Sequence, residues 1–313
     1  GASSAVPGGI SLMGGAAKAG LQRYSPGRRG QSSSTSVSVG EQMTEPLWQR
    51  LLLSPGNEEL LWELFHENSK NGRYDRGPSE EEIRLRVSQL QESLEFTGYP
   101  IIPLPDLLRP LNVTLDEAIR HRASLREMKP CPITVSDLAT ILHSAYGVTR
   151  NSQNSPSSRP LRTVPSGGGL YPLELFFHTA HAEGFEPGVY HYNPSKQHLR
   201  FLRAADNTSS ISASLIQPQL AVNASAMIFI TAMFERSIFK YRDRGYRYIL
   251  LEAGHVAQNI NLVATALGLG SVNIGGFFDR EIDEFLDLDG IAHSTIYMIA
   301  IGGQTASPAP SSP

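Results

Sequence analysis

The longest helix expected in this chain of 313 residues, over about 246–267, carries apolar side chains around most of its circumference. A helix on the surface of a domain shows one apolar stripe and an opposite polar face. We therefore expect this helix at the centre of a domain or in an interface. The segment Ser225–Phe234 ahead of it is apolar almost throughout, which predicts a strand buried on both faces. A chain of this length can bury the core that both elements require.

Ser and Thr residues mark the start of two further helices. Their side chains accept hydrogen bonds from the free N–H groups of a helix's first turn. Thr114 would begin a helix that runs through Arg122, and Thr134 or Ser136 would begin another that ends near Tyr146. A polar loop is then expected over 150–165.

Segments with strand composition follow this loop in close succession. Three of them predict an antiparallel meander: Glu174–Thr179, Gly188–Tyr192 and His198–Arg203. A last strand is expected over 294–301, after the glycines that should end the long helix, Gly268 and Gly270.

Composition divides the chain into four parts. Residues 1–40 are rich in Gly, Ser and Ala and contain basic but no acidic residues, so we expect a disordered leader there, although transit peptides have a similar composition. Prolines between positions 100 and 110 enforce an extended connector, and we place a boundary at this connector. The expected parts are the leader over 1–40, a helical extension over 41–106, the main domain over 107–304 and a disordered tail over 305–313.

The helical extension should contain two short helices over 41–70, split near Asn57, and one amphipathic helix that begins after Ser79 and continues to Gly98.

Charge and cysteine content exclude several classes of protein. The formal net charge of −3 and the sequence pI near 6.3 argue against a nucleic-acid partner, which requires a concentrated basic face. Cys131 is the only cysteine, so a disulfide framework within one chain is excluded, and a reducing compartment such as the cytoplasm is expected. No run of about 18 apolar residues occurs, so we expect no membrane span.

Basic and hydroxyl side chains gather after position 119, at Arg120, Arg122, Ser124 and Arg126. Guanidinium groups bind phosphate oxygens through paired hydrogen bonds, so this cluster would suit a phosphomonoester. The alternative is a solvated helix end with ordinary surface arginines, and spacing alone leaves both interpretations open.

Three consecutive glycines, Gly167–Gly169, require a tight turn or the close approach of a ligand to offset their cost in backbone entropy. They are no dinucleotide fingerprint, because Pro172 takes the last glycine position and a strand, not a helix, should follow. The serine-hydrolase pattern G-x-S-x-G is absent there as well. A second glycine turn, Gly275–Gly276, could offer backbone N–H groups to a phosphate or a ring edge. A generic loop is the alternative for both.

Lys240 and Tyr241 set an amine beside a phenol after the buried strand, among four arginines: Arg236, Arg242, Arg244 and Arg247. Neighbouring positive charge favours an uncharged amine, which can act as a base near neutral pH. A solvated charged loop is the alternative. On the long helix, we interpret His255, three residues after Glu252, as a buried hydrogen-bonding residue and not a metal ligand, because no second ligand pair at metal spacing accompanies it.

Taken in order, the segments Arg122–Arg126, Pro165–Glu174, Lys240–Tyr241 and Leu251–Asn259 resemble the SagB-type dehydrogenases of the nitroreductase-like superfamily. The resemblance covers about 107–303. It implies an α+β fold with a central, mainly antiparallel sheet flanked by helices, and a homodimer that holds FMN at the subunit interface. Members of the family oxidise thiazolines and oxazolines in peptides to thiazoles and oxazoles.

The resemblance also implies roles for single residues. Lys240 and Tyr241 match the catalytic pair, and no metal is implied. The implied FMN-binding residues are Arg122, Ser124 and Arg126 for the phosphate, Pro165, Ser166, Gly167 and Gly168 for the ring, and Gly275 and Gly276 on its other side. Related proteins often carry a basic residue just after the final strand, and Gly302–Gln304 offers none here. Which residue completes the phosphate site stays open.

The implied chemistry accounts for this set of residues. Making an azoline aromatic removes a ring proton and a hydride, so Lys240 would act as the base while flavin N5 accepts the hydride. Tyr241 could share the proton or stabilise charge on the ring nitrogen, and dioxygen would reoxidise the flavin.

Expected partners are an azoline-containing peptide or carrier-bound substrate, with a possible heterocyclase partner. Two alternatives are an NAD(P)H-dependent nitro or quinone reductase on the same fold and a flavin-binding scaffold subunit of a heterocyclase complex.

Overall fold

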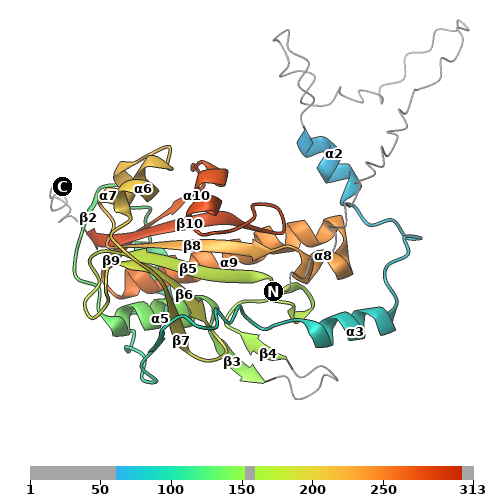
Figure 1. Ribbon diagram of the computed structural model, residues 1–313, viewed down its shortest axis with the longest axis horizontal. Coiled ribbons are helices and arrows are strands. Elements are labelled where there is room, and N and C mark those ends of the chain that lie inside the picture. The colour runs from blue at the N-terminus through green and yellow to red at the C-terminus, as the bar shows by residue number, and fades with distance from the viewer. Residues whose placement is uncertain (1–60, 152–158, 305–313) are drawn as a thin grey trace, which may run out of the picture. The chain divides into compact units, whose positions relative to one another are not determined.

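The computed structural model describes residues 61–151 and 159–304, all within one compact unit, Glu59–Pro313. Eight strands form its central sheet: β1 (Ile101–Pro103), β2 (Met128–Lys129), β5 (Leu173–Thr179), β6 (Gly188–Asn193), β7 (His198–Ala204), β8 (Ala226–Met233), β9 (Leu269–Ile274) and β10 (His293–Gln304). Their order is β1-β7-β6-β5-β8-β10-β2, with β9 also paired to β10 (Figure 1). These pairings are antiparallel, which confirms the predicted fold class.

Helices lie on both faces of this sheet (Figure 1). The helices of the described ranges are α2 (Leu61–Asn68), α3 (Glu80–Gln89), α4 (Leu115–His121), α5 (Val135–Tyr146), α6 (Thr208–Ala213), α7 (Gln219–Val222), α8 (Glu235–Tyr241), α9 (Asp243–Ala266) and α10 (Asp279–Phe285). Helices α5 and α9 pack on one face, and α6, α7 and α10 pack on the other. No helix in these ranges combines the length and apolarity that a bilayer span needs.

Strand β8 is buried on both faces, as its composition predicted. Ile228 and Ile230 belong to the core under α5 and α9, whereas Met227 and Phe229 belong to the core under α6, α7 and α10. Alternate residues of a strand point to opposite faces, so one apolar run serves two cores. The predicted meander is also confirmed, because β5 pairs with β6 and β6 pairs with β7.

The long helix α9 is central, as expected, and begins a few residues earlier than predicted, at Asp243. It ends before Gly268, whose φ of +76° is the left-handed conformation that favours glycine. The capping predictions for Thr114 and Thr134 are also confirmed. Thr114 and Thr134 each cap their helix through a capping box, in which the third helical residue bonds back to the cap.

The predicted helix after Ser79 is too long. Ser79 does cap α3, but the helix ends at Gln89 because Leu90 takes an extended conformation. The chain then crosses to the sheet, where Ser93 contacts β5 and Ile101–Pro103 pairs with β7. Contacts distant in sequence therefore override the helical periodicity of residues 90–98.

Other short elements were not predicted. The expected loop over 150–165 includes parts of two paired strands, β3 (Val148–Asn151) and β4 (Pro160–Arg162). Helices α6, α7, α8 and α10 were also missed, and the final strand is longer than expected. Helix α2 confirms the second of the two helices expected over 41–70. The leader over 1–40, the first of those helices, the centre of the polar loop and the tail over 305–313 lie outside the described residues.

Candidate active site

The glycine run and the lysine–tyrosine pair meet in the fold. Lys240 and Tyr241 form the C-terminal end of α8, and Gly168 lies directly against their side chains. A Cβ atom placed on Gly168 would lie 2.6 Å from the Tyr241 hydroxyl oxygen and 2.8 Å from Lys240 Nζ. Only glycine leaves room for an amine and a phenol at this point of the loop.

The glycine loop also requires unusual backbone angles. It forms a short 3₁₀ turn, η1 (Gly167–Gly169), in which Gly168 and Gly169 have φ values of +66° and +65°. Ser166 closes the loop, because its hydroxyl oxygen accepts a hydrogen bond of 2.9 Å from the Tyr171 backbone N–H. Gly167 faces Tyr248 on α9. The loop is thus held at both ends while the Gly168 backbone stays exposed.

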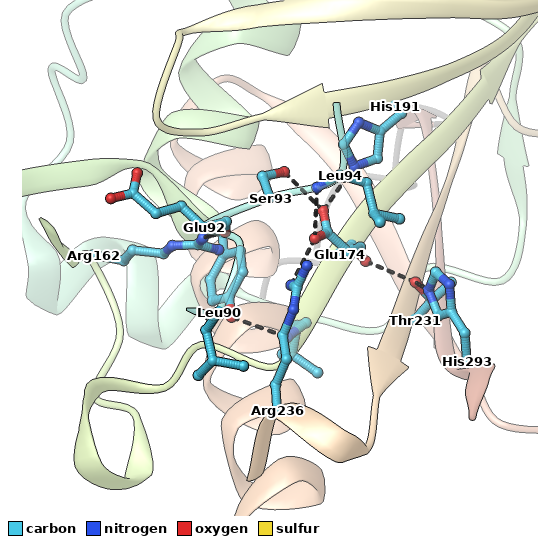
Figure 2. Close-up of polar contacts among 12 residues, drawn as sticks. Leu90, Glu92, Ser93, Leu94, Arg162, Glu174, His191, Thr231, Arg236 and His293 are labelled. Carbon is cyan, nitrogen blue, oxygen red and sulfur yellow. Dashed lines mark hydrogen bonds and ion pairs between the residues drawn. The ribbon is translucent and has the colours of Figure 1, made fainter. Parts of the chain in front are cut away.

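One buried carboxylate holds α8 against the sheet (Figure 2). Glu174 on β5 accepts hydrogen bonds from Arg236 Nη1 at 2.6 Å and from the Leu94 backbone N–H at 3.0 Å through one oxygen. Its other oxygen accepts a hydrogen bond of 2.9 Å from Ser93 Oγ and forms another of 2.7 Å with His191 Nε2. Arg236 belongs to α8, four residues before Lys240, so this ion pair ties the helix of the pair to the strand after the glycine loop.

Burial would raise the pKa of Glu174, but the Arg236 guanidinium and the His191 hydrogen bond outweigh it and lower the pKa well below its ordinary value. Glu174 therefore stays ionised in the protein interior. The sequence carries a signal for this buried ion pair at Glu174. A charged residue within the apolar run of β5 requires a buried partner.

A second buried carboxyl group lies beneath the loop. Glu252 on α9 accepts a hydrogen bond of 2.6 Å from the Tyr146 hydroxyl and another from the Ser166 hydroxyl. The Tyr146 oxygen also accepts from the Leu173 N–H at 3.2 Å, so Glu252 is linked to both ends of the loop. Burial raises the pKa of Glu252 to about 7, although these two hydrogen bonds lower it. The prediction for its neighbour His255 was wrong, because His255 is exposed on the outer face of α9.

The arginine cluster lies against β9. The Leu125 N–H donates to the Ser271 carbonyl at 2.9 Å, and Ser124 forms an isolated bridge with Ser271. Arg126 lines a cavity of about 200 Å³ together with Gly275 and Gly276. The structure therefore brings the arginine cluster to the second glycine turn.

Several side chains in this second group lack partners. Among the described residues, no ion pair or hydrogen bond engages the guanidinium of Arg122 or of Arg126. Asn273 also lines the cavity, and its Oδ1 atom is buried without a hydrogen-bond partner. Arg120 differs, because it forms an exposed ion pair of 3.0 Å with Asp116.

These features fit FMN as a ligand. Two unpaired guanidinium groups beside a glycine turn suit a phosphate, and an unpaired acceptor suits a ring N–H. The bare backbone at Gly168 suits a flat ring. The site residues form two groups: Lys240 and Tyr241 with the glycine loop, and the arginine cluster with the second glycine turn. These groups are separate in one chain, because Lys240 and Tyr241 precede the first turn of α9 whereas Ser271 and Gly275 follow its last turn.

Comparison with known proteins agrees with this fold. A model of the nitroreductase family matches residues 119–303, more than half of the chain. MJ1384 of Methanocaldococcus jannaschii, named as a nitroreductase, is 37% identical over 187 residues, which cover 60% of this chain and 89% of that protein. The microcin B17-processing protein McbC of Escherichia coli is 37% identical over 226 residues, 66% of this chain and 82% of that protein.

A solved structure gives the same result. The crystal structure of a protein from Anabaena variabilis, also named as a nitroreductase, superposes with a TM-score of 0.56 and 27% sequence identity. The match covers 75% of this chain and 50% of the Anabaena chain. The chain belongs to the nitroreductase family of flavin-type oxidoreductases.

Proposed function

We propose that this chain is an FMN-dependent dehydrogenase that converts thiazolines and oxazolines in peptides to thiazoles and oxazoles. The observation that carries the proposal is the contact of Lys240 Nζ and the Tyr241 hydroxyl with Gly168. This contact supports the proposal, because Lys240 would act as a base and Tyr241 as a hydrogen-bond donor at the exposed loop that would face a flat ring. The name of the E. coli relative, a processing protein for a microcin, supports a peptide as the substrate.

The cofactor would be held by residues of both groups. Arg122, Ser124 and Arg126 would bind the phosphate, with Gly275 and Gly276 offering backbone N–H groups beside it. Pro165, Ser166, Gly167 and Gly168 would lie along the ring. Bound FMN would supply a hydride acceptor, its N5 atom.

The chain's own residues would handle the proton. Lys240 would remove the ring proton of the azoline as the hydride leaves, so the product has lost two hydrogen atoms. Tyr241 would donate a hydrogen bond to the ring nitrogen and stabilise charge there. Lys240 Nζ lies 5.1 Å from the centre of the Tyr241 ring, and Tyr248 packs edge-on against Tyr241, which limits the positions that both groups can take.

A homodimer would bring the two groups of site residues together. The outer face of α9 exposes Leu250 and Leu251, and the neighbouring helix α4 exposes Leu115 and Ile119. Gly254 lies on the same face, and a Cβ atom there would meet nothing within 4 Å, so another backbone can approach closely. We propose that a second copy of the chain covers this face and completes the FMN site.

A reductase is the second candidate, because the relative from M. jannaschii is named as a nitroreductase. NAD(P)H oxidation driven by nitro compounds or quinones would identify it. A scaffold subunit would bind FMN without either activity.

Turnover of a thiazoline peptide by FMN-loaded protein tests the proposal. Mass spectrometry should show loss of two hydrogen atoms from the peptide, and Lys240→Ala should lower kcat by about 10²–10⁴-fold, the usual contribution of a general base. Lys196→Ala is the matched control, because Lys196 is an exposed lysine paired with Glu95. An unchanged kcat in Lys240→Ala would show that Lys240 is not the base.

A further inference from the structure

A polar cavity lies beside Lys240 and Tyr241, and both residues line it. It has a volume of about 430 Å³, within the usual range for ligand sites. One wall is the junction between α8 and α9, residues 240–244. The opposite wall comes from the segment after α2, residues 68–72 and 75–77. The residues proposed to act on the substrate therefore share a cavity with the N-terminal extension.

The wall formed by the extension is tied to α9. Arg247 Nε donates to Ser69 Oγ at 2.7 Å, and Arg247 Nη2 donates to the His66 carbonyl at 2.5 Å. Phe65 packs edge-on against Tyr246 with ring centres 5.4 Å apart. These contacts hold the segment at the cavity.

The cavity carries positive charge that the described residues do not neutralise. Arg76, Arg242 and Arg244 line it, and no ion pair joins any of them to another described residue. Arg244 Nε is buried without a hydrogen-bond partner. Asp75 and Asp243 are the acidic residues on the wall, and the basic residues there outnumber them, so the net charge of the lining is positive. A buried donor without a partner costs free energy unless a ligand satisfies it.

The backbone at the junction is strained as well. Arg242 has a φ of +49° and a ψ of −138°, a conformation that non-glycine residues rarely adopt. Such strain costs free energy and is typical of functional sites, where surrounding contacts maintain it. Here it directs the chain from α8 into α9 and sets Arg242 and Arg244 on the cavity wall.

We propose that this cavity binds a carboxylate of the substrate peptide next to the azoline ring, so that the protein prefers substrates with an acidic group at that position. The inference rests on the proposed function, because Lys240 and Tyr241 line the cavity. A carboxylate accepts paired hydrogen bonds from guanidinium groups, which this wall supplies. The group can be a Glu or Asp side chain beside the ring or the C-terminal carboxylate of the peptide.

Equilibrium binding tests the proposal without turnover. Dye-labelled thiazole peptides, the oxidised products, would be titrated with the FMN-loaded full chain and followed by fluorescence anisotropy. The three peptides differ only after the ring. The first has a Glu residue and an amide end, the second has a Gln residue and an amide end, and the third has a free C-terminal carboxylate in place of the amide. The Glu peptide or the free carboxylate should bind about tenfold more tightly than the Gln amide, as a charge-assisted hydrogen bond allows. The stronger of the two arms identifies the source of the carboxylate.

Variants show whether the cavity causes the preference. Arg244→Gln should reduce it to less than about threefold, and so should Arg76→Gln, which alters an exposed side chain and leaves folding intact. Arg280→Gln is the matched control, because Arg280 is an exposed arginine on α10 away from the cavity. Equal affinity for all three peptides would overturn the proposal, as would a preference that survives both cavity variants.

The outcome is separable from that of the proposed function. If a thiazoline peptide is oxidised but no charge preference is found, only the carboxylate site fails. If the preference is found without any turnover, the site stands and the proposed reaction fails.

Discussion

Among single residues, Glu252 and Gly168 connect the glycine loop to chemistry in different ways. Glu252 lies beneath the loop, where hydrogen bonds from Tyr146 and Ser166 hold its carboxyl group. Gly168 belongs to the loop itself and lies against the tips of the Lys240 and Tyr241 side chains. Glu252 therefore supports the loop, and Gly168 allows the proposed catalytic pair to approach it closely.

Glu252 should make the stability of the protein depend on pH. Its pKa is about 7 in the folded protein, above the ordinary value of 4.5. As the pH rises from about 4.5 to about 7, the unfolded chain releases this proton while the folded protein keeps it, so this stabilisation is lost. The free energy of unfolding of the parent protein should therefore fall by about 3 kcal/mol as the pH rises from about 4.5 to about 7. Glu252→Gln should not show this decrease.

Urea unfolding at several pH values measures this effect. Glu183→Gln is the control, because Glu183 is exposed and should leave the pH dependence unchanged. The assignment fails if Glu252→Gln and the parent protein lose equal stability over this range.

Gly168→Ala and Gly169→Ala should differ in activity more than in stability. Both positions have φ values near +65°, so an alanine costs about 1 kcal/mol of backbone strain at either one. Only the new methyl group at position 168 meets Lys240 and Tyr241, whereas nothing lies within 4 Å of position 169. We expect kcat for azoline oxidation to fall by roughly tenfold or more in Gly168→Ala relative to Gly169→Ala.

Equal kcat values in the two variants would show that the contact at Gly168 has no part in catalysis. Thermal unfolding of both variants checks that their stability is similar.

Among the elements, α8 depends on contacts with the rest of the fold. It has only seven residues, too few to be stable alone, and no side chain caps its N-terminus. The buried ion pair between Arg236 and Glu174 fixes it to β5 (Figure 2). The same carboxylate binds Ser93 and Leu94, so the chain after α3 and the helix of the proposed catalytic pair share one anchor.

Arg236→Ala should destabilise the fold strongly. Removal of the guanidinium leaves the Glu174 carboxylate buried without its cationic partner, which typically costs about 3–5 kcal/mol. Replacing both residues, as in Glu174→Gln with Arg236→Met, should cost less because no charge is left buried. Urea unfolding measures both variants.

Arg84→Ala serves as the control for this pair, because Arg84 forms an exposed ion pair with Glu80 that should contribute less than about 1 kcal/mol. If Arg236→Ala were no more destabilising than Arg84→Ala, the ion pair would not anchor α8.

For the whole molecule, the two groups of site residues and the exposed apolar face lead to one expectation. Lys240 and Tyr241 lie just before the first turn of α9, whereas the arginine cluster lies against β9, the strand that follows its last turn. The helix exposes Leu250 and Leu251. A second copy on this face would both bury the leucines and join the groups.

Leu251→Arg should separate the proposed dimer into monomers and weaken FMN binding. The Leu251 side chain is 61% exposed in one chain, so the substitution should not disturb folding of the monomer. Sedimentation velocity reports the mass, and flavin absorbance after gel filtration reports bound FMN. Leu85→Arg, at an equally exposed leucine on α3, should leave both unchanged. A parent protein that sediments as a monomer while retaining FMN would contradict the proposed interface.

Much of the fold could be predicted from local pattern. The capping residues Thr114 and Thr134, the apolar run of β8 and the periodicity of α9 each depend on neighbours within a few residues. The short elements could not be predicted in this way. Helix α8 and the strands β3 and β4 have little local preference and form because tertiary contacts hold them.

The candidate site divides in the same manner. The sequence shows its residue types, because their chemistry is a property of the residues themselves: three adjacent glycines, paired arginines and a lysine beside a tyrosine. Their arrangement was not visible. Gly168 and Lys240 are 72 positions apart, and Glu174 and Arg236 are 62 positions apart. Contacts at such separations depend on the order of strands in the sheet, so only the tertiary structure decided which of these groups meet.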